Sequence, residues 1–237
     1  MTQHLKDKKR NDMSIDVILD SYGSLLREVD EWFRRCLNAR PDLITCESGC
    51  SSCCRGLFDI TLLDACYLNK GLAELPPEDR ETVLVNARHQ LERLRSIWTD
   101  LDFPYILNYR PEEEWEELMP EDDETPCVLL GTDGRCLVYD NRPMTCRLHG
   151  IPLVDHSGEV MYDGWCTLNF ADRDPLVMPE LRWRFRSHFE DELSLFRAFT
   201  DELLGERIGE LDTFIPLALL QNFTGFDWRG WWEGRSR

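Results

Sequence analysis

The sequence lacks the features by which several common protein classes are recognised. No apolar run approaches membrane-spanning length, and no apolar segment follows the basic residues at the start, so neither a membrane span nor a secretory signal is expected. There is no phosphate-binding glycine loop, no His-Glu-x-x-His zinc motif and no nucleophile elbow. Nucleotide, zinc-protease and hydrolase chemistry are therefore without support.

Positive charge is also scarce. Lysine and arginine number 27 against 45 aspartates and glutamates, which gives a formal net charge of −18. Neutralising phosphates requires a basic face, so nucleic acid is not an expected partner. Acidic residues are concentrated between Glu112 and Glu124, where nine of the thirteen residues are Asp or Glu. This stretch is interpreted as a solvated connector, with a docking surface for a basic protein as the alternative.

Cysteine, by contrast, is abundant and clustered. Eight of the ten cysteines fall into two sets of four, the first packed into nine residues. The eight are Cys46, Cys50, Cys53, Cys54, Cys127, Cys136, Cys146 and Cys166. Gaps of three and two residues let one short loop wrap several thiolates around a soft metal. We predict that all eight are metal ligands.

The number of thiols suits two kinds of centre. A structural zinc ion takes four ligands, and an iron–sulfur cluster is commonly held by four cysteines. Eight thiols therefore match two four-ligand sites, or one site with thiols to spare. The expected cofactor is an iron–sulfur cluster or Zn²⁺, and the scarcity of histidine favours iron. Because the chain can bury a core without cross-links and is expected to be cytoplasmic, metal binding takes precedence over disulfides.

Individual residues within this pattern leave alternatives open. Successive side chains of an extended chain alternate in direction, so one of Cys53 and Cys54 is expected to serve a second centre, bridge two ions or act as a reactive thiol. Cys36 and Cys66 lie on apolar helical stripes and are interpreted as core thiols. His149 is a further nitrogen donor at ligand spacing, with a hydrogen-bonding or surface role as the alternative.

Two arginines lie close to the later cysteines in the sequence. Arg142 and Arg147 are candidates to donate hydrogen bonds to sulfur and so tune the centre. A salt bridge to Asp140 or Asp155 is the competing interpretation.

Hydrophobic periodicity predicts a mainly α fold, a helical bundle with short β-hairpins around a cysteine-rich metal-binding core. Helices are expected over residues 14–40, 62–75, 77–98, 181–203 and 212–220, with a short one around Trp115 and a stop at Gly205. Hairpins are expected over residues 128–139 and 151–162. Residues 1–13 are predicted to be a disordered leader. Residues 14–237 are predicted to form one domain, with its metal core at about 40–170 and a helical part at about 177–232.

The motifs of the two cysteine sets resemble those of the YkgJ-type cysteine-cluster family, which is described as a zinc- or iron-chelating domain and most of whose members have no assigned reaction. The first set matches as Cys46-x3-Cys50-x2-Cys53-Cys54. The second matches as Pro126-Cys127, Cys136-Leu-Val-Tyr, Arg142-Pro-x-x-Cys146-Arg and Cys166. Residues Val128-Leu129 and Leu148-His149-Gly150 depart from the family pattern. The resemblance implies a bacterial cytoplasmic protein whose eight cysteines bind iron or zinc.

The family is distantly related to flagellin lysine N-methylases, which supplies a second function hypothesis. The first hypothesis is an iron–sulfur or zinc protein with a redox, metal-handling or structural role. The alternative is a cluster-dependent protein lysine methyltransferase that uses S-adenosylmethionine. Cys46-x3-Cys50-x2-Cys53 has the spacing of the radical S-adenosylmethionine loop, but the flanking segments are helical rather than barrel strands. A third hypothesis is a structural zinc module that presents the acidic segment to a basic partner.

Overall fold

The computed structural model describes residues 14–120 and 123–235, and its fold is mainly α, as the sequence predicted. The proposed leader, residues 1–13, lies outside the described residues. Eight α-helices and four short strands occur in the described ranges. The strands form two antiparallel pairs, β1 with β4 and β2 with β3.

Helix α1 (Ile15–Ala39) is the longest of the described helices and carries the face on which the main core is built. Its buried positions recur at helical spacing, as expected for an amphipathic helix. They are Ile18, Leu19, Tyr22, Gly23, Leu25, Leu26, Val29, Trp32 and Cys36. The helix ends before Pro41, because the residue preceding a proline disfavours helical geometry. The prediction of a core thiol at Cys36 is therefore confirmed.

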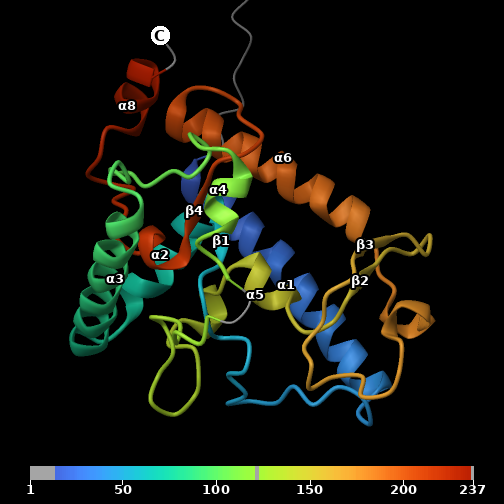
Figure 1. The fold of residues 1–237 in the computed structure, drawn as a ribbon. Helices are drawn as coiled ribbons and strands as arrows, with labels where there is room; N and C mark the ends of the chain where they lie inside the picture. Colours follow the sequence, from blue (N-terminus) through green and yellow to red (C-terminus); the bar gives the residue numbers. More distant parts are fainter. Residues whose placement is uncertain (1–13, 121–122, 236–237) are drawn as a thin grey trace, which may run out of the picture.

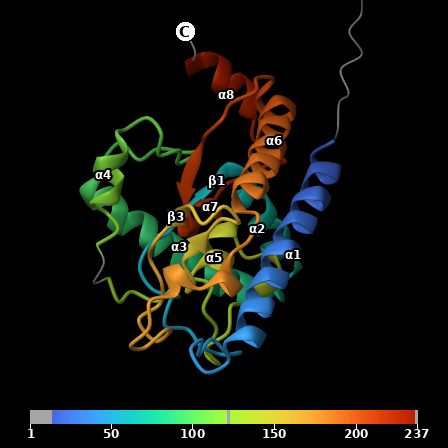
Figure 2. The same cartoon turned by 90° about the vertical axis from the view of Figure 1, so that its right-hand side faces the viewer.

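Helix α6 (Phe185–Leu204) packs along α1, and the two helices lie side by side in both views (Figure 1 and Figure 2). Gly205 ends it in the left-handed conformation with φ of 81°. The sequence prediction began this helix at Leu181, which is wrong, because Leu181 ends a separate 3₁₀ turn. That turn is fixed to α1 by Trp32, whose Nε1–H donates to the Leu181 carbonyl at 2.9 Å.

Helix α2 (Leu62–Glu74) follows directly from strand β1 (Asp59–Thr61). Its first turn is capped, since the Thr61 hydroxyl accepts the Asp64 N–H at 3.1 Å. Cys66 is buried on this helix, which confirms its interpretation as a core thiol.

A helix was predicted over residues 212–220, and its first part is wrong. Residues Asp212–Phe214 form strand β4, which pairs with β1, and only Ile215–Ala218 is helical, as α7. The cause is a partner distant in sequence. Backbone pairing with β1 satisfies N–H and C=O groups that a local helix would otherwise have paired.

A second, smaller core lies where α3 (Pro77–Ile97) packs against α7 and the segment that follows α3. Within that segment the acidic helix α4 (Glu112–Glu116) turns Trp115 inward, where only 5% of it is exposed. The short helix predicted around Trp115 is thus present. Part of the acidic segment is an amphipathic element of the fold, and residues 121–122 lie outside the description.

Of the two predicted hairpins, the second is confirmed and the first is wrong in extent. Strands β2 (Leu153–Val154) and β3 (Val160–Tyr162) pair antiparallel. Residues 128–139 instead form a tight loop with one isolated bridge, Leu130 to Cys136. A 3₁₀ helix, η1 (Tyr139–Asn141), and the short helix α5 (Met144–Leu148) then follow.

The aromatic C-terminal segment forms helix α8 (Trp228–Arg235) and packs back on the main core. Trp228 is buried and stacks on Phe223 with ring centroids 5.2 Å apart. Phe226 packs edge-on against Trp228 at 5.3 Å. The aromatic residues are therefore used for packing.

Candidate metal centre

The two cysteine-bearing stretches are joined by antiparallel backbone pairing. Arg55 bridges to Pro126, and the Cys127 N–H donates to the Cys54 carbonyl at 2.9 Å. The Gly56 N–H donates to the Thr125 carbonyl at 2.8 Å. Sulfur-bearing residues 73 positions apart in sequence therefore occupy neighbouring backbone positions.

The end of the acidic segment helps to hold this pairing. Glu124 forms an ion pair with Arg55 at 3.3 Å, and its carbonyl accepts a hydrogen bond from the same guanidinium. Asp123 accepts the Thr125 N–H at 2.9 Å and pairs with Arg93 at 3.5 Å. At least two of the clustered carboxylates thus align the cysteine loops.

A pair of glycines forms a second contact between the two cysteine stretches. Gly134, at the turn before Cys136, has φ of +79°, and a Cβ there would lie 2.9 Å from the Gly49 carbonyl oxygen. A side chain at Gly134 would force the loops apart. In Figure 1 the light-blue loop and the yellow-green loop accordingly lie beside each other at the lower edge of the ribbon.

Cys146 is positioned by the short helix α5, whose first N–H is held by a buried carboxylate. The Met144 N–H donates to Asp64 Oδ1 at 2.9 Å. Asp64 also accepts the Tyr22 hydroxyl at 2.7 Å, so one carboxylate links α1, α2 and α5. The position of Cys146 is therefore fixed by the main core.

We call Cys54, Cys127, Cys136 and Cys146 the inner thiol group. The pKa of Cys146 is raised well above its usual range by burial and then by Cys127 and Cys136. Burial likewise raises the pKa of Cys127 to about 11, with Cys136 adding to the effect. The same thiols, Cys127, Cys146 and Cys136, act on Cys54. Their mutual effects show that these four sulfurs share one neighbourhood.

We call Cys46, Cys50, Cys53 and Cys166 the outer thiol group. Burial raises the pKa of Cys46, and Cys166, Cys50 and Cys53 raise it further. A Cβ built on Gly150 would lie 3.6 Å from Cys46 Sγ and 3.8 Å from Cys166 Cβ. An open surface depression of about 470 Å³ is lined by Cys50 and by Thr45, Glu47, Ser48, Gly49 and Leu168.

Cys53 and Cys54 lie at the junction of the two groups. A hydrogen bond from Cys53 lowers the pKa of Cys54, while the same bond and burial raise that of Cys53. Cys53 acts on Cys46 of the outer group and also on Cys127 of the inner group. The adjacent pair thus contributes to both neighbourhoods.

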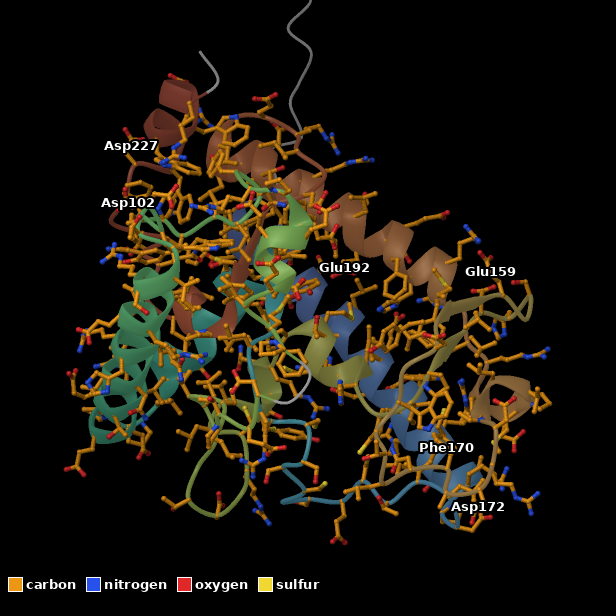
Figure 3. The ribbon with its side chains drawn as sticks, in the orientation of Figure 1. Asp102, Glu159, Phe170, Asp172, Glu192 and Asp227 are labelled. Carbon is orange, nitrogen blue, oxygen red and sulfur yellow. The ribbon has the colours of Figure 1, made fainter. Side chains whose placement is uncertain are left out.

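Asn169 is a residue of this region that the sequence patterns did not identify. Its side chain is only 2% exposed, and its Oδ1 accepts the Thr45 N–H at 2.9 Å. Its Nδ2 donates to the Gly150 carbonyl at 2.7 Å and lies 3.4 Å from Cys46 Sγ. Nearby, the Phe170 N–H donates to the Leu43 carbonyl at 2.7 Å, and Phe170 lies beside the end of α1 in Figure 3. An asparagine three residues after Cys166 carries no motif signal.

The two arginines near the later cysteines form salt bridges with a partner that the sequence did not indicate. Arg142 and Arg147 both bind Asp30 of α1. The predicted partners Asp140 and Asp155 are wrong as side-chain partners, although the Asp140 carbonyl accepts from Arg147 at 2.7 Å. Asp30 is reached only through the packing of α1 against α5.

The ring of His149 lies edge-on to Phe58, with ring centroids 5.8 Å apart, and burial lowers the pKa of His149.

All ten cysteines are free thiols, so disulfides do not seal either group. Within residues 14–120 and 123–235, no three Cys, His, Asp or Glu side chains are already arranged so that they could hold a metal ion.

A family model described as "Putative zinc- or iron-chelating domain", CxxCxxCC, matches residues 45–167, more than half of the chain. The chain belongs to this family. The matched range contains all eight clustered cysteines, and its first gap, between Cys46 and Cys50, has three residues where the family name has two. The family description, together with the eight cysteines inside the matched range, supports a metal-binding role for this domain.

The other comparisons add no relative. Neither the search of curated proteins nor the search of solved structures finds a match. In the described parts of the chain, none of the helices combines the length and the apolar character needed to cross a bilayer.

Proposed function

We propose that this protein binds two metal centres, one in the outer and one in the inner thiol group. The observation that carries the proposal is the sorting of eight free thiols into two sets of four, which meet at Cys53 and Cys54. Four thiolates are the ligand number of a structural zinc ion and of a common iron–sulfur cluster.

The residues present suit such a centre chemically. Burial raises the pKa of Cys46, Cys127, Cys136 and Cys146, and repulsion from neighbouring thiols raises the pKa of Cys46, Cys127 and Cys146 further. A bound cation favours the deprotonated thiols and offsets this repulsion, which is why metal binding to such sites releases protons. Asn169 is in place to donate an N–H to the Cys46 sulfur.

We further propose that the two centres release their bound metal at different rates. Cys50 lines an open depression on the surface, whereas Cys146 is held in the core by α5. An ion bound by the outer group is therefore expected to be released first, and the inner group to support the fold. This assignment favours a metal-handling or structural role in the cytoplasm, where thiols remain reduced.

Metal analysis of the anaerobically purified protein tests the proposal. A brown protein that absorbs near ~400 nm and contains iron and sulfide is an iron–sulfur protein, and a colourless one with zinc is a zinc protein. Cys46→Ser and Cys146→Ser are each expected to lose one of the two centres. The core-thiol variants Cys36→Ala and Cys66→Ala serve as matched controls and are expected to keep both.

Two outcomes contradict the proposal. One is wild-type protein that binds neither zinc nor iron when reduced and reconstituted. The other is full metal content in Cys46→Ser or in Cys146→Ser, which would show that the corresponding thiol group is not a metal site.

A further inference from the structure

Arg142 is held in one orientation beside the inner thiol group. It follows the 3₁₀ helix η1, and its Nη2 donates to Asp30 Oδ1 at 3.0 Å. Its guanidinium carbon lies 4.0 Å from the centroid of the Tyr139 ring, within the range of a cation–π contact. With its side chain 19% exposed, the group is largely withdrawn from water. Two independent contacts therefore fix the plane of the guanidinium.

Neither contact uses the Nε donor of this guanidinium. Arg142 Nε is buried and has no hydrogen-bond partner among the described residues. A buried donor without a partner is destabilising. The neighbouring Arg147 shows the contrast, since its Nε donates to the Arg142 carbonyl, its Nη2 to the Asp140 carbonyl and its Nη1 to Asp30. Each guanidinium nitrogen of Arg147 thus donates a hydrogen bond, whereas Arg142 Nε donates none.

The unused donor belongs to the Arg142 guanidinium, whose positive charge acts on thiols of the inner group. Arg142 lowers the pKa of Cys146 and Cys136, against the raising effect of burial, and it acts in the same direction on Cys53. In return, Cys146 favours the charged form of Arg142. Geometry agrees with this, because Arg142 stands between Cys136 and Cys146 in the chain and its carbonyl is held by Arg147 of α5, the helix that carries Cys146. The guanidinium is therefore near the inner thiol group.

We propose that Arg142 is a positioning residue of the inner metal centre, with its Nε–H donating to thiolate sulfur in the metal-loaded protein. The inference rests on the proposed function. Four thiolates around a divalent ion leave a net charge of about −2, and a guanidinium fixed beside them offsets part of it. Asp30, Tyr139 and Arg147 are then the supports that hold this cation toward the sulfurs.

Cobalt(II) is the probe for the test, because it replaces zinc at thiolate sites and its sulfur-to-metal charge-transfer band reports on hydrogen bonding to sulfur. The variants are Arg142→Met, which removes charge and donor, and Arg142→Lys, which keeps the charge and removes the Nε–H. Arg135→Met is the matched control, since Arg135 adjoins Cys136 in sequence but its side chain is 63% exposed. Each variant is also studied with Cys46→Ser, which restricts binding to the inner group.

Arg142→Met is expected to raise the dissociation constant of the inner Co²⁺ by about 10- to 100-fold and to shift the charge-transfer band. Arg142→Lys is expected to lie between Arg142→Met and the wild type in affinity, with a shifted band. Arg135→Met is expected to match the wild type in both. A general loss of structure would not produce this order, and circular dichroism of each variant checks the fold.

Wild-type affinity and an unshifted band in Arg142→Met would overturn the inference. If that variant does not fold, Arg142→Lys decides, and an affinity and band equal to wild type would overturn the inference equally. Failure of the wild-type chain to bind Co²⁺ is a different result, because it overturns the proposed function itself. The two failures are therefore distinguishable.

Discussion

The replacement of Asn169 by leucine is the sharpest test of how the outer thiol group is held. The amide joins its own segment to two others, one containing Thr45 and Cys46 and one containing Gly150. Leucine preserves the approximate size of the side chain but none of its hydrogen bonds. The Gly150 carbonyl is then left with the Cys166 N–H alone, at 3.4 Å.

The magnitude follows from the contacts that are lost. Two short hydrogen bonds, at 2.9 and 2.7 Å, each contribute about 1 kcal/mol net, and a buried carbonyl with a weakened partner adds to the cost. The Asn169→Leu variant is therefore expected to lose about 2–3 kcal/mol of unfolding free energy. Urea unfolding of reduced, metal-free protein measures this, and Asn86→Leu at an exposed position of α3 is the control, expected within about 0.5 kcal/mol of wild type.

An aspartate at position 169 separates the contribution of the amide oxygen from that of the amide nitrogen. Asn169→Asp keeps the acceptor for the Thr45 N–H but loses the donor to the Gly150 carbonyl. At neutral pH it is expected to be destabilised, and acidification that protonates the new carboxyl is expected to restore part of the stability. A free energy of unfolding for Asn169→Leu within 0.5 kcal/mol of wild type would refute the view that this amide holds the loops together.

Three further predictions concern other parts of the molecule. Burial, and then the charge of Asp64, raise the pKa of Glu192, which points from α6 toward α1, from 4.5 to about 8. The folded protein thus keeps a proton that the unfolded chain releases, so this contribution to stability is complete below pH 4.5 and is lost as pH rises to about 8. Urea titrations at several pH values are expected to show this slope in wild type and not in Glu192→Gln, and equal slopes would contradict the assignment. Gly150→Ala, at φ of +105°, is expected to lose about 1–3 kcal/mol on thermal or urea unfolding, whereas Gly234→Ala in α8, with no neighbour within 4 Å, is expected to be neutral or slightly stabilising; equal effects would rule out backbone strain at Gly150. A chelator added in excess is expected to remove metal in two phases, the slower accompanied by a fall in melting temperature, and a single phase without such a fall would contradict different roles for the two centres.

The helices could be predicted well because their signals are local. The stripe from Ile18 to Cys36 has the period of an amphipathic helix, and Thr61 with Asp64 caps α2 within one turn. Prediction failed where a distant partner decided the structure. Residues 212–214 are extended because β1 pairs with them. The turn within residues 128–139 lies against Gly49, a contact that no local pattern indicates.

For the site, the sequence proposed a set of residues and gave no arrangement of them. Thiol spacing singled out eight cysteines, and the family match covers the same range. The spacing of the thiols gave no indication of Asn169, because the contacts of that side chain with Thr45 and Gly150 join residues far apart in sequence. Asp30 was missed for the same reason, since it reaches Arg142 and Arg147 only across a helix interface.

By itself, the sequence determined which atoms are available for metal chemistry, since cysteine content and spacing are properties of the chain alone. It also determined most helices, because their hydrogen bonds close within four residues. Only the tertiary structure decided which thiols are neighbours. Their grouping depends on the backbone pairing of residues 54–56 with 125–127 and on the closure of residues 45 and 150 by Asn169. Such contacts close long loops, and their free energy comes from the whole packed core rather than from any local pattern.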